Sequence, residues 1–206
     1  MRTVASDLSR PDAAREMYQT LKVDSVTVDI LVNNAGFGGH GRFAEGDLDR
    51  DLEMLRLNIV VLTALTRPFL GDMTARGRGR IMNVASTAAF QPGPFMSVYY
   101  ATKAYVLSFS EALSYEVRGS GVSVTALCPG VTATEFQDRA AMAGLLLTRM
   151  GMMDAESVAR IGFRGMMAGR AVVIAGARNR ALVQLLRFSP RRVVLAIVGR
   201  LQPARR

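Results

Sequence analysis

Short apolar runs alternate with longer stretches of helical periodicity along the chain. Ile30-Leu31-Val32 is apolar without alternation, which is typical of a strand buried on both faces of a parallel sheet. The predicted strands are Arg2–Ser6, Asp29–Asn33, Arg80–Val84, Ser123–Cys128 and Ala171–Ala175. The predicted helices are Pro11–Leu21, Asp47–Arg76, Val98–Arg118 and Asp154–Ala168. This alternation predicts a doubly wound α/β fold, a parallel sheet with helices on both faces.

Small and polar residues follow four of the predicted strands. They are Asp7, Asn33-Asn34-Ala35-Gly36, Ser86 and Pro129-Gly130. Ligands of open α/β sheets bind beyond the carboxyl ends of the strands, so these residues outline one crevice. In the helices, Pro11 suits a first turn, and Pro68 should kink or divide the long second helix.

The composition indicates a soluble globular protein of one domain. The chain has 206 residues, 50% of them hydrophobic and 21% charged. Its single cysteine excludes an internal disulfide framework and fits a reducing compartment. We find no signal-peptide pattern at the N-terminus and no run of about 20 apolar residues that would span a bilayer. A cytoplasmic enzyme is therefore the expectation.

The basic charge belongs to the C-terminal tail. Residues 178–206 hold eight arginines and no acidic residue, leaving 18 basic and 17 acidic residues elsewhere. We therefore divide the chain into a domain, 1–177, and a basic helical tail, 178–206. Since the domain itself is nearly neutral, a nucleic-acid partner is not expected. The tail's short apolar stretches predict a helical pair that covers a substrate pocket or a subunit interface, with peripheral attachment to anionic lipid as the alternative.

Tyr99 and Lys103 lie four residues apart and so share one face of a predicted helix. A free phenol has a pKa of about 10, too high for a base at neutral pH. An ammonium group about 4 Å away would stabilise the phenolate by roughly 4 kcal/mol at an effective dielectric of about 20. The pair could therefore serve acid–base chemistry, but a surface pair has the same spacing. Tyr100, three residues from Lys103, shares the face too, so spacing does not choose between the tyrosines.

The surrounding motifs favour the catalytic interpretation. Ser86 ends a strand thirteen residues before Tyr99, and Asn58 lies in an apolar helical stretch where an amide needs partners. Together with Asn33-Asn34-Ala35-Gly36 and the run from Pro129 to Thr134, this order resembles the classical short-chain dehydrogenases/reductases, from Arg2 to about Ala175. The resemblance implies a Rossmann-like fold and a nicotinamide cofactor.

The resemblance also implies roles for the catalytic group. Tyr99 would exchange a proton with the substrate's carbonyl or alcohol oxygen, and Ser86 would orient that oxygen. Lys103 would lower the pKa of Tyr99 and hold the nicotinamide ribose. Asn58 would hold a water that links Lys103 to solvent. The family's four-residue interval selects Tyr99 over Tyr100.

Further residues match the family's cofactor site. Asp7, with Leu8 beside it, matches the acidic residue that approaches the adenine. Asn33, Ala35 and Gly36 belong to the turn that passes close to the adenosine ribose, and Thr132 and Thr134 match positions that hold the carboxamide and phosphates. Tyr99 and Lys103 would contact the nicotinamide ribose as well. NADP or NAD is expected, with a weak preference for NADP from the family.

Three other features receive plainer interpretations. His40, the single histidine, is predicted to be a loop residue, and no metal site is expected around it. Cys128 is predicted to be a core residue. Met142 to Met153 are expected in a flexible lid over the substrate.

The sequence opens in what should be the family's third strand. No glycine-rich turn of the type that holds pyrophosphate is found, so about two strand–helix units are expected to be absent. Arg2–Ser6 would then lack ladder partners, and the remaining sheet would expose an apolar edge. Either the natural protein begins upstream, or the chain is a truncated, non-catalytic interaction or scaffold protein. By itself, the 206-residue chain is expected to bind nicotinamide cofactor poorly.

The leading functional prediction is reversible carbonyl–alcohol oxidoreduction on a small or lipid-like apolar substrate. Homo-oligomers are usual in the family the chain resembles.

Overall fold

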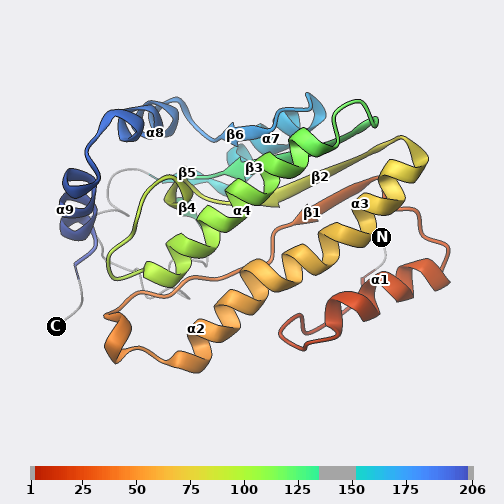
Figure 1. Cartoon of the computed structure of the whole chain (residues 1–206), viewed down its shortest axis with the longest axis horizontal. Coiled ribbons are helices and arrows are strands. Elements are labelled where there is room, and N and C mark those ends of the chain that lie inside the picture. Colours follow the sequence, from red (N-terminus) through yellow and green to blue (C-terminus); the bar gives the residue numbers. More distant parts are fainter. Residues whose placement is uncertain (1–2, 135–151, 204–206) are drawn as a thin grey trace.

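A computed structural model describes residues 3–134 and 152–203 and shows a four-stranded parallel sheet (Figure 1). The strands are β1 (Ile30–Asn33), β2 (Gly79–Val84), β3 (Val122–Cys128) and β6 (Val172–Ile174), in the spatial order β1-β2-β3-β6. The helices are α1 (Ala13–Val23), α2 (Leu48–Leu55), α3 (Leu62–Arg76), α4 (Ser97–Glu116), α7 (Ala155–Met167), α8 (Ala177–Phe188) and α9 (Arg191–Leu201). Two-residue strands β4 (Thr132–Ala133) and β5 (Met153–Asp154) pair separately.

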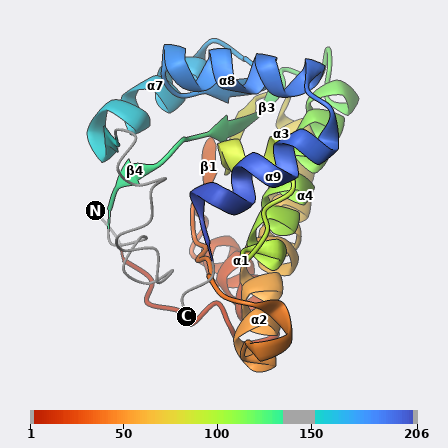
Figure 2. The ribbon, with the colours of Figure 1, turned by 90° about the vertical axis from the view of Figure 1, so that its left-hand side faces the viewer.

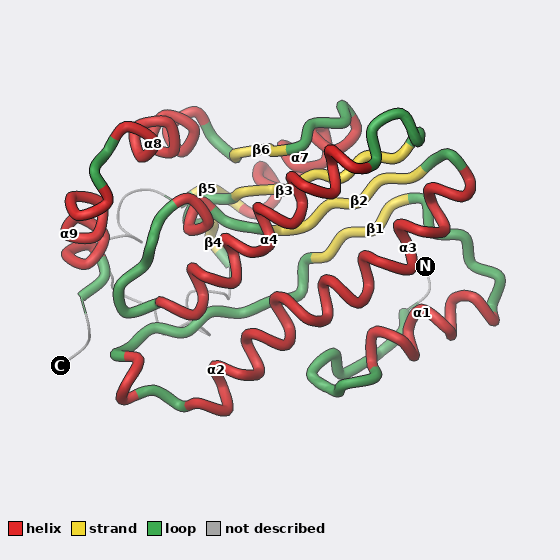
Figure 3. Tube along the Cα trace, viewed as in Figure 1, coloured by secondary structure: helices red, strands yellow, loops and turns green. Residues whose placement is uncertain are grey.

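Helices cover both faces of the sheet, which confirms the doubly wound α/β prediction. Helices α3 and α4 pack on one face and α7 packs on the other (Figures 1 and 2). Ile81 of β2 and Val124 and Ala126 of β3 are completely buried between these layers, as their unbroken apolar runs predicted. Figure 3 shows the strands lying side by side, with α4 running along the sheet.

The long predicted helix forms almost as expected, as α2 and α3 joined by a π-helical turn at Arg56–Val61. Asp47 begins it, because its carboxylate accepts hydrogen bonds from the backbone N–H groups of Asp49 and Arg50. The helix is not divided at Pro68, which lies inside α3; the irregularity is the π turn.

Within the described residues, Leu48–Arg76 is long and apolar enough to cross a membrane by length and composition alone. Sequence inspection found no such stretch. Leu65 and Phe69 pack against α1 and Met73 packs beneath the sheet, whereas 39% of the apolar window as a whole is buried. The buried side of this helix belongs to the core of the α/β domain.

The predicted strand Arg2–Ser6 is wrong where the structure describes it. Residues 3–7 form an exposed irregular segment, and α1 packs on α3. A strand is held by its ladder, and β1 has one hydrogen-bonded neighbour, β2, among the described residues. Ile30 and Val32 of β1 are 40% and 46% exposed, so an apolar sheet edge is open as predicted.

A buried polar network ties β1, β2, α3 and α4 together. The amide nitrogen of Asn33 donates to Thr66 Oγ1 (3.0 Å) and to Asn83 Oδ1 (2.8 Å). Asn83 Nδ2 donates to Ser110 Oγ (2.9 Å). Each of these side chains is at least nine-tenths buried. Because every buried donor finds an acceptor, the network fixes the helices against the sheet at little energetic cost.

Candidate active site

The carboxyl end of β2 and the first turns of α4 bring Ser86, Tyr99 and Lys103 together. Ser86 lies two residues after the end of β2 and caps a short 3-10 turn, Thr87–Phe90, where its hydroxyl accepts from Ala88 N (3.1 Å). Tyr99 is buried on α4 and its phenol forms a side-chain hydrogen bond with Ser86. The two hydroxyl groups proposed to contact a substrate oxygen are therefore adjacent.

Lys103 lies one helical turn after Tyr99 and points back to the end of β2. Its Nζ donates to the carbonyl oxygen of Val84 (2.8 Å) and lies 5.8 Å from the centroid of the Tyr99 ring. The side chain is only 7% exposed. A buried lysine anchored to a strand end beside a tyrosine differs from a surface Tyr–Lys pair, so the structure excludes the surface interpretation.

Burial dominates the acid–base properties of both groups. It raises the pKa of Tyr99 to about 12, while the Ser86 hydrogen bond opposes the rise. Burial also lowers the pKa of Lys103 to about 8. For Tyr99 this direction is opposite to that predicted from the Lys103 charge, because burial of the phenol disfavours the phenolate more than the Ser86 hydrogen bond favours it. Without ligand, Tyr99 is therefore a protonated, potential acid.

Asn58 is buried in the π turn and connects two elements of the site. Its Nδ2 donates to Phe37 O (2.9 Å) and to Thr102 Oγ1 (3.1 Å), and its Oδ1 accepts from Phe37 N (3.2 Å). This side chain thus holds the loop after β1 against α4, a role that sequence reasoning missed. The predicted water relay through Asn58 stays a prediction.

The turn after β1 passes close to the catalytic group. A Cβ on Gly36 would lie 2.7 Å from Asn58 Oδ1 and 3.8 Å from Lys103 Nζ, so this position needs glycine. Ala35 beside it is exposed and Asn33 is buried. Both amide hydrogens of Asn33 are used within the core network, so its side chain supports the turn from below.

Asp7 and Leu8 lie beside the π turn. Asp7 accepts hydrogen bonds from the backbone N–H and the hydroxyl of Ser9 (2.9 and 2.7 Å), which lower the pKa of Asp7. Arg56 donates to Ser9 O (3.4 Å), which brings this turn to the π turn that carries Asn58. Leu8 packs into the apolar cluster between α1 and α3. The adenine contact proposed for Asp7 remains a prediction.

Thr132 and Thr134 follow β3 at the same end of the sheet. Thr132 Oγ1 donates to Gly130 O (3.1 Å), and Thr134 Oγ1 donates to Thr132 O (3.4 Å). Strand β4, which contains Thr132, pairs with β5. The predicted lid from Met142 falls outside the described residues as far as residue 151.

Cys128 and His40 match their plainer predictions. Cys128 is fully buried at the end of β3, and burial raises the pKa of its thiol to about 12, so it is a core residue. His40 lies in a loop, where its Nε2 is 3.3 Å from the carbonyl oxygen of Gln202. Among the described residues, no group of three His, Cys, Asp or Glu side chains forms a metal site.

The tail forms the predicted helical pair, α8 and α9, and α9 packs on α4, the helix that carries Tyr99. Val194 and Val198 of α9 share an apolar cluster with Tyr99 and Tyr100. Gln202 is completely buried; its Oε1 accepts from the Tyr100 hydroxyl (3.2 Å). Its Nε2 also donates to Pro94 O (2.7 Å). Because Tyr100 anchors the tail, its hydroxyl is turned away from the role proposed for Tyr99.

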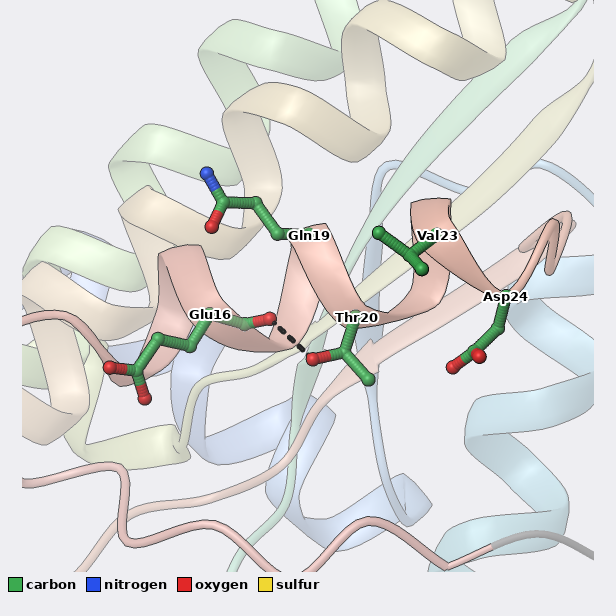
Figure 4. A pocket seen from close by; sticks show the side chains of 5 residues that line it. All are labelled: Glu16, Gln19, Thr20, Val23 and Asp24. Atoms are coloured by element: carbon green, nitrogen blue, oxygen red, sulfur yellow. Dashed lines mark hydrogen bonds between the residues drawn. The ribbon is translucent and has the colours of Figure 1, made fainter.

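A shallow surface depression of about 320 Å³ lies on α1 and is lined by none of these residues (Figure 4). It is lined by Glu16, Gln19, Thr20, Val23 and Asp24, and Thr20 Oγ1 donates to Glu16 O (2.9 Å). One exposed helix face forms it without a buried polar group, so we assign it no function.

Comparisons with a family profile and with individual relatives agree on the family of this chain. The sequence profile of the short chain dehydrogenases matches residues 1–143, more than half of the chain. A ketoacyl reductase, HetN, of Nostoc sp. (strain PCC 7120) is 39% identical over 103 residues, which cover 50% of this chain and 36% of that protein. Nodulation protein G of Rhizobium sp. (strain N33) is 32% identical over 154 residues, covering 71% and 62% respectively. The chain thus spans roughly a third to two thirds of these relatives' lengths.

Solved structures agree on the fold. A short-chain dehydrogenase from Sphingobium yanoikuyae, in complex with NADPH, superposes with a TM-score of 0.78 and 28% identity, over 98% of this chain and 76% of that one. A 7beta-hydroxysteroid dehydrogenase has a TM-score of 0.81 at 23% identity, over 95% and 75%, and supports the fold alone.

Proposed function

This chain belongs to the short-chain dehydrogenases, and we propose that the protein is an NAD(P)-dependent oxidoreductase that interconverts a carbonyl and an alcohol. The observation that carries the proposal is the group that Ser86 forms with the buried side chains of Tyr99 and Lys103 at the carboxyl end of β2. Ketoacyl reductases among the relatives and the NADPH complex of a similar structure support this class of reaction.

The described residues fit the nicotinamide–ribose end of such a cofactor. Lys103 is an ammonium group with three N–H donors, one of which is used by Val84 O. The other two would hold ribose hydroxyls, and glycine at position 36 lets the turn after β1 pass close to Asn58 and Lys103 Nζ. The bound cofactor supplies or accepts the hydride. We prefer NADP weakly over NAD.

The residues of this chain would handle the proton. In the reducing direction the neutral Tyr99 phenol donates its proton to the carbonyl oxygen of the substrate as that oxygen gains negative charge. Ser86 donates a hydrogen bond to the same oxygen and orients it. A pKa of about 12 keeps Tyr99 protonated at neutral pH, which suits this acid role. In the oxidising direction the same proton returns to the phenolate.

The proposed substrate is small or lipid-like and apolar, because the catalytic tyrosine lies in an apolar cluster that includes Met54 and Met96. We further propose that the protein is a cytoplasmic homo-oligomer. Exposed apolar side chains on α2, Leu48 and Leu52, support association with another copy.

The test is ketone reduction followed by NADPH and NADH absorbance. It is run with the 206-residue chain and with the chain extended by any segment that its reading frame encodes upstream. Tyr99→Phe should lose most of kcat, whereas Tyr100→Phe should retain it, since Tyr100 bonds to Gln202. Equal losses in the two variants would contradict the assignment of Tyr99.

The rival hypothesis is a non-catalytic interaction protein, and the open edge of β1 is the observation that favours it. An in-frame stop before Met1, together with absence of turnover and of cofactor binding by calorimetry, would favour that alternative.

A further inference from the structure

Helices α8 and α9 form the edge of the molecule and are joined by Ser189 and Pro190 (Figures 1 and 2). Each helix buries one narrow stripe. Val183 of α8 is buried, as are Val194 and Val198 of α9. Packing onto the domain thus uses these three valines, the partly buried Leu186 and the buried Gln202, and the exposed apolar side chains of both helices need another explanation.

The opposite face of α8 is apolar as well. Ala181, Leu185 and Phe188 follow one another at helical spacing and are about half a turn from Val183. Leu185 is 63% exposed and Phe188 is 87% exposed. Beyond the turn, Val193 is exposed on α9. A helix that is apolar on both sides usually has a second partner.

Arginines lie close to these exposed apolar side chains in the sequence. Arg187, Arg191 and Arg192 are exposed within the same short stretch. The sequence from Arg178 to the C-terminus contains no Asp or Glu. We define the tail tip as Leu185, Arg187, Phe188, Arg191, Arg192 and Val193. It combines apolar side chains that can enter an acyl layer with guanidinium groups that bind phosphate.

We propose that the tail tip docks on an anionic lipid surface. A second copy of this chain is a poorer occupant, because a two-fold contact through the tip would bring the arginines of both copies together without acidic partners from the tail. An anionic bilayer matches the charge and accepts Leu185 and Phe188 at the same time.

Docking would place the bilayer beside the catalytic helix. The inner face of α9 shares an apolar cluster with Tyr99 and Met54, while its tip contacts lipid. Apolar substrates dissolved in the membrane would then meet the protein near the site. This consequence rests on the proposed function, whereas the docking does not.

The chain contains no tryptophan, so Phe188→Trp introduces a unique fluorophore at the tip. On addition of phosphatidylglycerol vesicles its emission should shift to the blue and be quenched by brominated acyl chains; phosphatidylcholine vesicles should have no effect. Raising the salt from 0.1 to 1 M, which shortens the screening length from about 10 to about 3 Å, should reverse the shift. Val23→Trp, at a position that is 85% exposed on α1, is the control and should show no shift.

Charge variants complete the test. Each arginine near an anionic surface contributes about a five-fold gain in affinity, so Arg191→Gln/Arg192→Gln should weaken binding about 25-fold. Arg15→Gln/Arg67→Gln removes the same charge from exposed positions on α1 and α3 and should leave binding unchanged. Absence of a shift with anionic vesicles overturns the proposal, as does a lipid-independent shift that grows with protein concentration, which would indicate a second copy.

Discussion

Lys103 should destabilise the folded protein at neutral pH. Burial lowers its pKa from 10.5 to about 8, and each tenfold change in proton affinity corresponds to about 1.4 kcal/mol. Keeping this ammonium in the folded protein therefore costs on the order of 3 kcal/mol at pH 7. The hydrogen bond to Val84 O offsets part of that cost, about 1–2 kcal/mol.

Lys103→Met keeps the approximate length of the side chain. It removes both the cost of burying the ammonium group and the hydrogen bond to Val84 O. At pH 7 the variant should be more stable than the wild type by about 1–2 kcal/mol, the burial cost less the lost hydrogen bond. Such a gain at a position proposed to be catalytic would be an example of the common trade-off between stability and activity.

The sign of the difference should depend on pH. Between pH 8 and 10.5 the unfolded wild type still binds the Lys103 proton while the folded protein has released it, so wild-type stability rises through this window relative to the variant. The advantage of Lys103→Met should fall by about 3 kcal/mol and reverse by pH 10.5.

Urea denaturation followed by circular dichroism at pH 7, 9 and 10.5 measures this difference. Lys22→Met is the matched control, because Lys22 is the other lysine of the chain and is half-exposed beside Asp72. The control should change stability by less than about 1 kcal/mol at pH 7, because exposed ion pairs contribute little. A constant difference for Lys103→Met across this range would refute the reasoning about its burial.

Three further predictions concern the supports of the site. In a double-mutant cycle of Tyr100→Phe and Gln202→Leu, the free energies of unfolding should show a coupling of about 0.5–1.5 kcal/mol, and strict additivity would contradict the hydrogen bond between them. Asn58→Ala should lower the free energy of unfolding by about 2–4 kcal/mol, since three hydrogen bonds are lost in a buried place; a change below about 0.5 kcal/mol in denaturant titration would be inconsistent with that role. Gly36→Ala should lower the melting temperature because its Cβ meets Asn58 Oδ1, whereas Gly71→Ala, in open space on α3, should raise it slightly; the opposite order would contradict the close approach.

The sequence pattern predicted those elements whose hydrogen bonds form within the element itself, as in a helix. The helix that carries Tyr99 and Lys103 was predicted at Val98–Arg118 and is found at Ser97–Glu116. The strand at Arg2–Ser6 failed for the opposite reason. A strand acquires its hydrogen bonds from neighbouring strands, and the short apolar run at Val4 contains no information about whether neighbours exist.

For the candidate site, too, the sequence predicted some features and the tertiary structure decided others. Ser86, Tyr99 and Lys103 were identified from their order and spacing, and the fold brings them together at the end of β2. Asn58 was selected as a relay, yet its contacts bind the loop at Phe37 to α4. Those partners are distant in sequence, so no local periodicity could name them.

The sequence alone therefore determined which residues are candidates for acid–base chemistry. It also determined which helices and strands carry them, because helical and strand periodicities depend only on residues that are close together in the sequence. Only the tertiary structure decided that the pKa of Tyr99 is raised, since the burial of its phenol depends on all the elements packed around it. It also decided the place of the tail. Gln202 meets Tyr100 across 102 residues, a contact that exists only after the chain has closed on itself.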